Sequence, residues 1–193
     1  MKTILAGFLI LGIGLFACGA PNSDKSIEAE KAEYAKEVRA RQQPMIDELE
    51  GMLGADTKMT LFAINPTETG PKAVDEKWLG KKLFRGHIVR SSAPIEDGQE
   101  QAALIHALTD GMRETDGSVA ECFEPYFGLT VERGDRKIDI VVCFSCLQAE
   151  VFGAYSDTGF ILARTHADVF IASAKRHDLG LPFRDPNPIQ PRQ

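Results

Sequence analysis

The sequence has few cysteines and no excess of positive charge. Four cysteines among 193 residues are too few for a scaffold built on disulfides. Acidic residues outnumber basic ones by 28 to 22, which gives a formal net charge of −6. Because nucleic-acid binding depends on basic side chains that neutralise phosphates, this balance argues against a nucleic-acid partner. The sequence also lacks GxSxG, HExxH, P-loop and GxGxxG motifs, which places a binding module ahead of an enzyme.

The longest apolar run lies at the N-terminus, and it is shorter than a membrane-spanning helix needs. Ile4 to Phe16 contains 13 uncharged residues after Lys2, a length typical of the apolar region of a signal peptide and too short to span a bilayer comfortably. It ends in Leu15-Phe16-Ala17-Cys18, which resembles the lipobox of bacterial lipoproteins. An uncleaved N-terminal anchor, or a signal peptide with an incidental cysteine, are the alternatives.

The lipobox resemblance implies an anchor and a location. It implies removal of residues 1–17 and attachment of lipid, including palmitate, to Cys18. Several acyl chains would hold the protein stably on a membrane of the cell envelope. Gly19 stands where an aspartate would imply retention, so in a Gram-negative host the resemblance implies the outer membrane, facing the periplasm.

The rest of the chain divides by composition. We expect a tether at 18–25, a charged helix at 26–44, a globular domain at 45–181 and a disordered, proline-rich tail at 182–193. Pro44 interrupts the helical stripe and predicts a kink or the start of a second helix. That apolar stripe consists of Tyr34, Val38, Met45, Leu49 and Met52.

Two strands and two helices are expected in the globular domain besides its central hairpin and the strand that follows the hairpin. Strands are predicted at Lys58–Ile64, ended by Asn65-Pro66, and at Leu83–Ser92, with a loop around Trp78 between them. The spacing of Asp97 and Glu100 is that of a capping box at a helix start. The face of that helix would be Leu104, Ile105, Leu108 and Met112, and a last helix would begin near Thr165–Asp168 and end at Gly180-Leu181-Pro182.

A hairpin is predicted around Gly134-Asp135, where glycine suits the first position of a type II′ turn. This register pairs Leu129 with Ile140 on one face and Glu132 with Lys137 on the other. A third strand would follow at 148–155, with a turn at 157–159. We therefore expect an α+β fold with an N-terminal helix, then a small antiparallel sheet with a central hairpin and helices packed on one face.

Two short segments carry a family resemblance. Cys122-Phe123-Glu124-Pro125 and Cys143-Phe144-Ser145-Cys146 resemble the CFxP and CFxC segments of an uncharacterised bacterial family, with a hairpin between them. The resemblance implies no activity. That family often has a basic residue and a histidine at the positions of Tyr126 and Phe127. A metal or catalytic role of that basic residue and histidine is therefore not expected in this chain.

The three cysteines of the domain are the candidate chemical site. Cys143-x-x-Cys146 with Cys122 could form a thiol–disulfide or a zinc site, whereas buried, unreactive cysteine is the plainer alternative. Residues three apart in an unbroken strand point to opposite faces, so Cys143 and Cys146 could meet only at a sharp turn. A bulge at Pro125 would instead place Cys122 opposite Cys146. We therefore expect any disulfide to join Cys122 to Cys146 and to leave Cys143 free.

Aromatic residues beside Pro125 are a second candidate. Phe123, Tyr126 and Phe127 would form a partner surface if they faced solvent, and a satellite of the core if they did not. The leading hypothesis is a lipid-anchored, non-enzymatic module that binds an envelope protein or component. The alternative is a thiol–disulfide or zinc protein that uses Cys122, Cys143 and Cys146.

Overall fold

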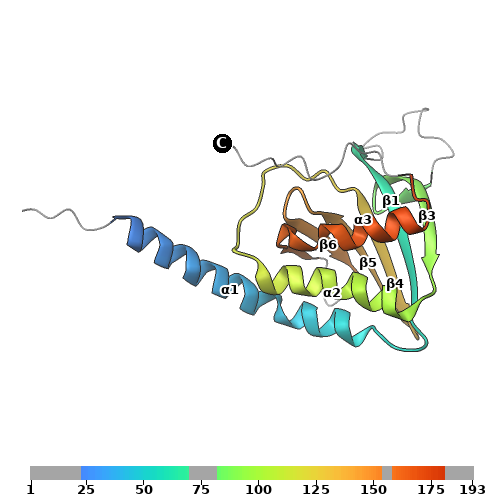
Figure 1. Cartoon of the computed structure of the whole chain (residues 1–193), viewed down its shortest axis with the longest axis horizontal. Coiled ribbons are helices and arrows are strands. Elements are labelled where there is room, and N and C mark those ends of the chain that lie inside the picture. The colour runs from blue at the N-terminus through green and yellow to red at the C-terminus, as the bar shows by residue number, and fades with distance from the viewer. Residues whose placement is uncertain (1–22, 70–81, 154–157, 181–193) are drawn as a thin grey trace, which may run out of the picture.

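A computed structural model describes residues 23–69, 82–153 and 158–180 (Figure 1). The predicted signal peptide, the start of the tether, the segment around Trp78 and the tail lie outside these residues. The helices are α1 (Ser23–Gly51), α2 (Gly98–Glu114), a short 3-10 turn η2 (Arg164–His166) and α3 (Ala167–Arg176). The strands are β1 (Lys58–Thr69), β2 (Leu83–Phe84), β3 (His87–Ile95), β4 (Phe127–Arg133), β5 (Arg136–Cys143), β6 (Gln148–Phe152) and β7 (Thr158–Ile161).

The strands form one curled antiparallel sheet in the order β2-β3-β1-β4-β5-β6-β7. Its centre is the predicted hairpin, with the predicted register. Leu129 pairs with Ile140, and Glu132 pairs with Lys137, whose ammonium lies 2.9 Å from the Glu132 carboxylate. Gly134 has the positive φ of 60° that its turn requires. The expected α+β class is confirmed.

The helices cover one face of this sheet. α2 and α3 lie across it, and the second half of α1 runs beside α2 (Figure 1). Alternate residues of β1 up to Ala63, and of β4, β5 and β6, point into the layer between sheet and helices, as the alternation of a strand requires. The predicted apolar face of α2 is buried there. This core includes Ile46, Leu49, Leu61, Leu104, Ile105, Leu108, Met112, Leu129, Ile140 and Phe170.

The other face of the sheet is partly covered by the hairpin at the edge of the same sheet, β2–β3. The β2–β3 hairpin curls over it, so that the Phe84 ring occupies the space that a side chain on Gly128 would fill. Arg85 donates a hydrogen bond of 2.8 Å to Asp139, which also accepts one of 2.6 Å from Thr130. A second cluster of apolar side chains results, made of Phe62, Ile64, Phe84 and Val141, with Val89, Phe123 and Phe152 against it.

Buried polar contacts join α2 to α3. Asp97 caps α2 as expected, by accepting from the Gln99 amide, but the predicted capping box between Asp97 and Glu100 does not form. Glu100 turns away from the cap, and its carboxylate accepts hydrogen bonds from Ser173 at 2.6 Å and interacts with Arg176 and His177 on α3. Burial would raise the pKa of Glu100, but these partners together hold that pKa below its ordinary value.

Two boundaries that the sequence placed at prolines, one at Pro44 and one at Asn65-Pro66, are absent from the structure. Pro44 lies inside α1 rather than at the start of a second helix. β1 continues through Asn65-Pro66 to Thr69, and its pairing with β3 shifts register beyond Ala63. Proline is tolerated at such irregular positions because the ladder there does not need its missing N–H.

Three further boundaries were also wrong. The predicted strand at 83–92 is two strands, because Arg85 and Gly86 have φ values of 47° and 86° and form a tight turn. Thr158 and Gly159, predicted as part of a turn, belong to β7. α3 ends before Gly180, because Asp178 takes the left-handed conformation with φ 51° and the Leu179 amide donates to the carbonyl of Ala174.

Within the described ranges, no helix is both long enough and apolar enough to cross a membrane. Residues 26–34 of α1 are all exposed, and Ala35, which follows them, is buried. The apolar stripe of α1 is therefore buried mainly in the second half of the helix, where α1 meets α2.

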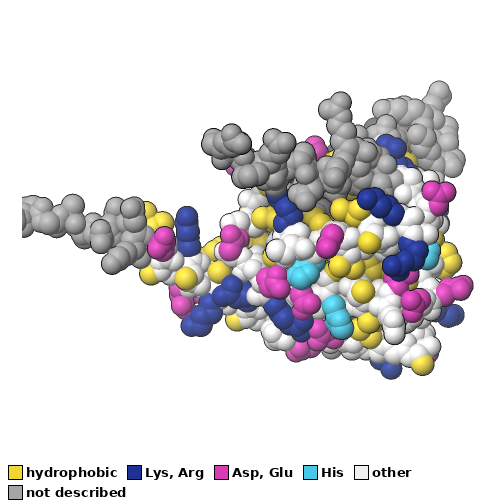
Figure 2. Space-filling model, viewed as in Figure 1, with side chains coloured by type: hydrophobic (Ala, Val, Ile, Leu, Met, Phe, Trp, Pro, Cys, Tyr) yellow, Lys and Arg dark blue, Asp and Glu magenta, His cyan; other side chains and the backbone are white. Residues whose placement is uncertain are grey.

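Acidic and basic side chains are interspersed over the face of the molecule that carries the helices (Figure 2).

Candidate functional site: three cysteines at the end of strand β5

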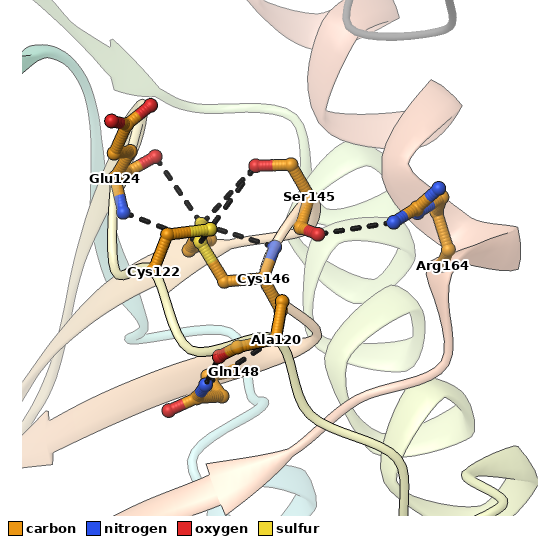
Figure 3. The surroundings of a disulfide bond; sticks show 8 residues. Ala120, Cys122, Glu124, Ser145, Cys146, Gln148 and Arg164 are labelled. Atoms are coloured by element: carbon orange, nitrogen blue, oxygen red, sulfur yellow. Dashed lines mark hydrogen bonds between the residues drawn. A yellow bond between two sulfur atoms is a disulfide. The ribbon is translucent and has the colours of Figure 1, made fainter. Parts of the chain in front are cut away.

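Cys122, Cys143 and Cys146 meet at one end of the sheet (Figure 3). Cys143 is the last residue of β5, and Cys146 lies in the turn Phe144–Leu147 that leads into β6, called here the cysteine turn. Cys122 comes from the segment between α2 and β4. The three residues together are called the sulfur cluster.

The disulfide in this cluster joins Cys143 to Cys146, whose Cα atoms are 5.2 Å apart. The predicted Cys122–Cys146 bond is therefore wrong for this structure. The strand geometry that separates residues three apart no longer applies, because β5 ends at Cys143 and the chain reverses at once. Leu147 makes this reversal without glycine by adopting a left-handed conformation, with φ 59°. No bulge forms at Pro125, since β4 begins only at Phe127.

Cys122 is nevertheless the neighbour of Cys146, as the sequence suggested. Its Sγ lies 3.6 Å from the Cys146 Sγ. Cys122 is free and exposed, whereas Cys143 and Cys146 have no exposed surface. The site therefore consists of a buried disulfide in contact with one thiol that solvent can reach.

Polar groups surround the buried sulfurs. The Glu124 amide donates to the Cys146 Sγ, and the Cys146 amide donates to the Cys143 Sγ, each at 3.2 Å. The Ser145 hydroxyl lies 3.3 Å from the Cys143 Sγ, and the Glu124 carbonyl oxygen lies 3.2 Å from the same sulfur. Donors aimed at a sulfur stabilise negative charge on it, so each of these two sulfurs has a donor ready for a thiolate.

Contacts from distant segments hold the site together. The Ala120 amide donates to the Cys146 carbonyl at 3.1 Å, and the Gln148 side chain donates to the Ala120 carbonyl at 2.7 Å. On the other side of the turn, Arg164 donates to the Ser145 carbonyl at 3.0 Å (Figure 3). The segment with Cys122 is thus fixed against the cysteine turn. Sequence reasoning did not single out Ser145, Gln148 or Arg164 for this site, because no local pattern links them.

The aromatic candidates are mainly part of the core. Phe127 is buried and packs with Phe144 and Phe170, at ring distances of 6.4 and 5.4 Å, so it cannot belong to an exposed partner surface. Phe123 and Tyr126 are half-buried and pack against the two apolar clusters. Burial raises the pKa of Tyr126, and the nearby charges of Glu124 and Cys122 raise it further.

Among the residues that the structure describes, no three His, Cys, Asp or Glu side chains are placed together so that they could hold a zinc ion. Two of the three sulfurs proposed as ligands are joined in the disulfide. The geometry of this state favours thiol–disulfide chemistry.

Comparison of the chain with protein-family models, with curated proteins and with solved structures finds no match in any of the three. The site must therefore be interpreted from its own chemistry.

Proposed function

We propose that this protein is a thiol–disulfide exchange protein of the bacterial envelope, with the Cys143–Cys146 disulfide as its redox-active bond. The observation that carries the proposal is the contact between a free, exposed thiol and a buried disulfide, 3.6 Å apart between Cys122 Sγ and Cys146 Sγ. Disulfides exchange when a thiolate attacks one of their sulfurs, so a thiol in contact with a disulfide has the geometry for exchange.

The placement of the disulfide supports a chemical role over a purely structural one. It links residues only three apart in sequence, so it closes a very small loop and constrains the unfolded chain less than a long-range bond would. The hydrogen-bond donors on its sulfurs favour the thiolates that reduction produces. External dithiols or disulfides are the class of partner that would exchange electrons with it.

A redox titration of the full-length protein tests this proposal. In a Cys18→Ser background, which removes the only cysteine outside the cluster, the oxidised chain has one free thiol and the reduced chain three. The expected midpoint lies between about −270 and −120 mV, the range of redox-active pairs. Thiol counting by alkylation and mass spectrometry in thiol/disulfide buffers gives the value. A bond that remains oxidised below about −300 mV would be structural and would overturn the proposal.

The membrane anchor is the second part of the proposal, and it rests on the lipobox at Cys18. A lipid on Cys18 would place the sulfur cluster in an oxidising compartment, where disulfides persist. Labelled palmitate should enter the wild-type protein and not a Cys18→Ala variant. Equal labelling of both proteins would remove the anchor and leave the redox proposal standing.

The binding-module hypothesis has less support from the described residues. The partner surface predicted from the sequence consisted of Phe123, Tyr126 and Phe127. Phe127 is buried, and Phe123 and Tyr126 pack against the apolar clusters. Binding of an envelope partner can accompany exchange, since exchange itself requires a partner at Cys122.

A further inference from the structure

We infer that Cys122 is the entry point to the buried disulfide and that exchange passes through Cys146, with Cys143 as the first leaving thiolate. This inference rests on the proposed function and assigns a role to each of the three sulfurs. Figure 3 shows the arrangement that carries it.

Burial determines which sulfur meets the partner. Cys143 and Cys146 have no exposed surface, whereas Cys122 is exposed. A thiolate must approach the sulfur that it attacks, so a partner from solution reaches Cys122 and is excluded from the disulfide itself. Electrons can then reach the buried bond only through Cys122, unless the site opens.

Distance determines which sulfur Cys122 attacks. Its Sγ contacts the Cys146 Sγ at 3.6 Å, about the separation of reacting atoms in a near-attack arrangement. In the first step the Cys122 thiol releases its proton to solvent, and the thiolate forms a bond to Cys146. The Cys143–Cys146 bond breaks, and the electron pair leaves on Cys143. One disulfide replaces another, so no net oxidation occurs.

Polar groups are placed for this leaving thiolate. The Cys146 amide, 3.2 Å from the Cys143 Sγ, and the Ser145 hydroxyl, 3.3 Å from it, can both donate to the sulfur as it takes the charge. Once protonated, the Cys143 thiol can donate to the Glu124 carbonyl at 3.2 Å. A better-stabilised thiolate leaves faster, so the first step is favoured in this direction.

The second and third steps transfer electrons from the partner. A partner thiolate attacks the exposed Cys122 Sγ, and the Cys122–Cys146 bond breaks. Cys146 leaves as a thiolate that can accept a hydrogen bond from the Glu124 amide, which lies 3.2 Å from this sulfur in the state with the Cys143–Cys146 disulfide. A second partner thiolate then attacks the partner's own sulfur in this mixed disulfide, and Cys122 leaves as a thiolate that takes up a proton. The partner becomes a disulfide, and the protein gains two electrons and two protons as three thiols.

Kinetics of reduction test this route in the full-length Cys18→Ser protein. With dithiothreitol as the probe, Cys122→Ser should slow reduction of the Cys143–Cys146 bond at least about tenfold, because the intramolecular route is lost. Blocking Cys122 with N-ethylmaleimide before reduction should have the same effect without a substitution. Val119→Ser, at a 54% exposed position on the same segment, is the matched control and should leave the rate unchanged.

Two trapping variants test the sequence of attack. With oxidised glutathione as the oxidant, which is reduced to two thiols, Cys143→Ser should accumulate a Cys122–Cys146 bond, found by peptide mapping without reduction. Cys146→Ser under the same conditions should form no bond between Cys122 and Cys143. Unchanged reduction in Cys122→Ser, or equal bond formation in the two trapping variants, would overturn the inference. A wild-type disulfide that resists reduction altogether would instead overturn the proposed function, so the two failures are distinguishable.

Discussion

The two ends of strand β5 reverse the chain in different ways. At its start, Gly134 and Asp135 make a two-residue turn, and a Cβ on Gly134 would meet no atom within 4 Å. At its end, the cysteine turn is closed by a disulfide and contacted by the Cys122 segment and by Arg164. One turn is made by its own residues, and the other by residues from three parts of the chain.

The two turns differ in how far their backbones depend on contacts from the rest of the chain. The Gly134 turn needs only a residue that tolerates positive φ, so its sequence and its structure agree. The cysteine turn uses Leu147 with φ 59°, a conformation that leucine adopts with strain and that surrounding contacts must maintain. The proposed redox site lies at the end of β5 where distant segments hold the backbone, and one of those segments also supplies the third thiol.

The largest expected effect comes from removing the disulfide. The double variant Cys143→Ser/Cys146→Ser should lower the free energy of unfolding by about 2 kcal/mol, from the chain entropy of a very short loop. Urea unfolding measures it. The wild-type protein under reducing conditions is the control and should match the variant. A variant as stable as the oxidised protein would show that contacts alone maintain the cysteine turn.

A somewhat smaller effect is expected at the other end of β5. Gly134→Ala should destabilise by about 1.5 kcal/mol, because alanine pays for the left-handed conformation that glycine adopts freely. Thermal or urea unfolding measures the change. Gly51→Ala is the matched control, since its Cβ also meets open space without a positive φ, and its stability should change by less than about 0.5 kcal/mol. A shifted redox midpoint in Gly134→Ala would contradict the independence of the two turns.

The smallest effect concerns the link between the Cys122 segment and the cysteine turn. Gln148→Ala removes the hydrogen bond of 2.7 Å to the Ala120 carbonyl and should cost about 1 kcal/mol of unfolding free energy. It should also slow reduction of the disulfide, because Cys122 would be held less closely. Gln43→Ala removes an exposed Gln43–Asp47 pair on α1, and should change stability by a few tenths of a kcal/mol and leave the reduction rate unchanged.

The sequence predicted those elements whose structure is decided locally. The register around Gly134, the Asp97 cap and the buried face of α2 follow from periodicity and turn chemistry, and all three are confirmed. Arg85 and Leu147 were missed as turn residues because their types give no signal for positive φ, and Asp178 was missed because Gly180, two residues later, gave the stronger signal for a helix end. At Leu147 contacts from other segments maintain that conformation, whereas at Arg85 the turn also uses Gly86.

The candidate site was predicted in part. The three cysteines were identified together, and the proximity of Cys122 to Cys146 was expected, but the resting bond was assigned to the wrong pair. The choice between partners depends on where β5 stops, a boundary that sequence periodicity does not define. The donors from Glu124 and Ser145 could not be foreseen, because they depend on how the turn is folded.

The exposed first part of α1 limits what the sulfur cluster can reach. From Ser23 to Glu30 the helix projects away from the globular domain, over about 12 Å at the rise of an α-helix, before Tyr34 packs against Gly117 (Figure 1). A helix keeps this length, whereas a flexible linker would let the domain collapse onto the lipid surface. If Cys18 carries the lipid, α1 acts as a spacer that holds Cys122 away from the headgroups. The redox partners of Cys122 would then be proteins or thiols of the aqueous periplasm. Cysteines embedded in the bilayer would lie too far from Cys122 to react with it.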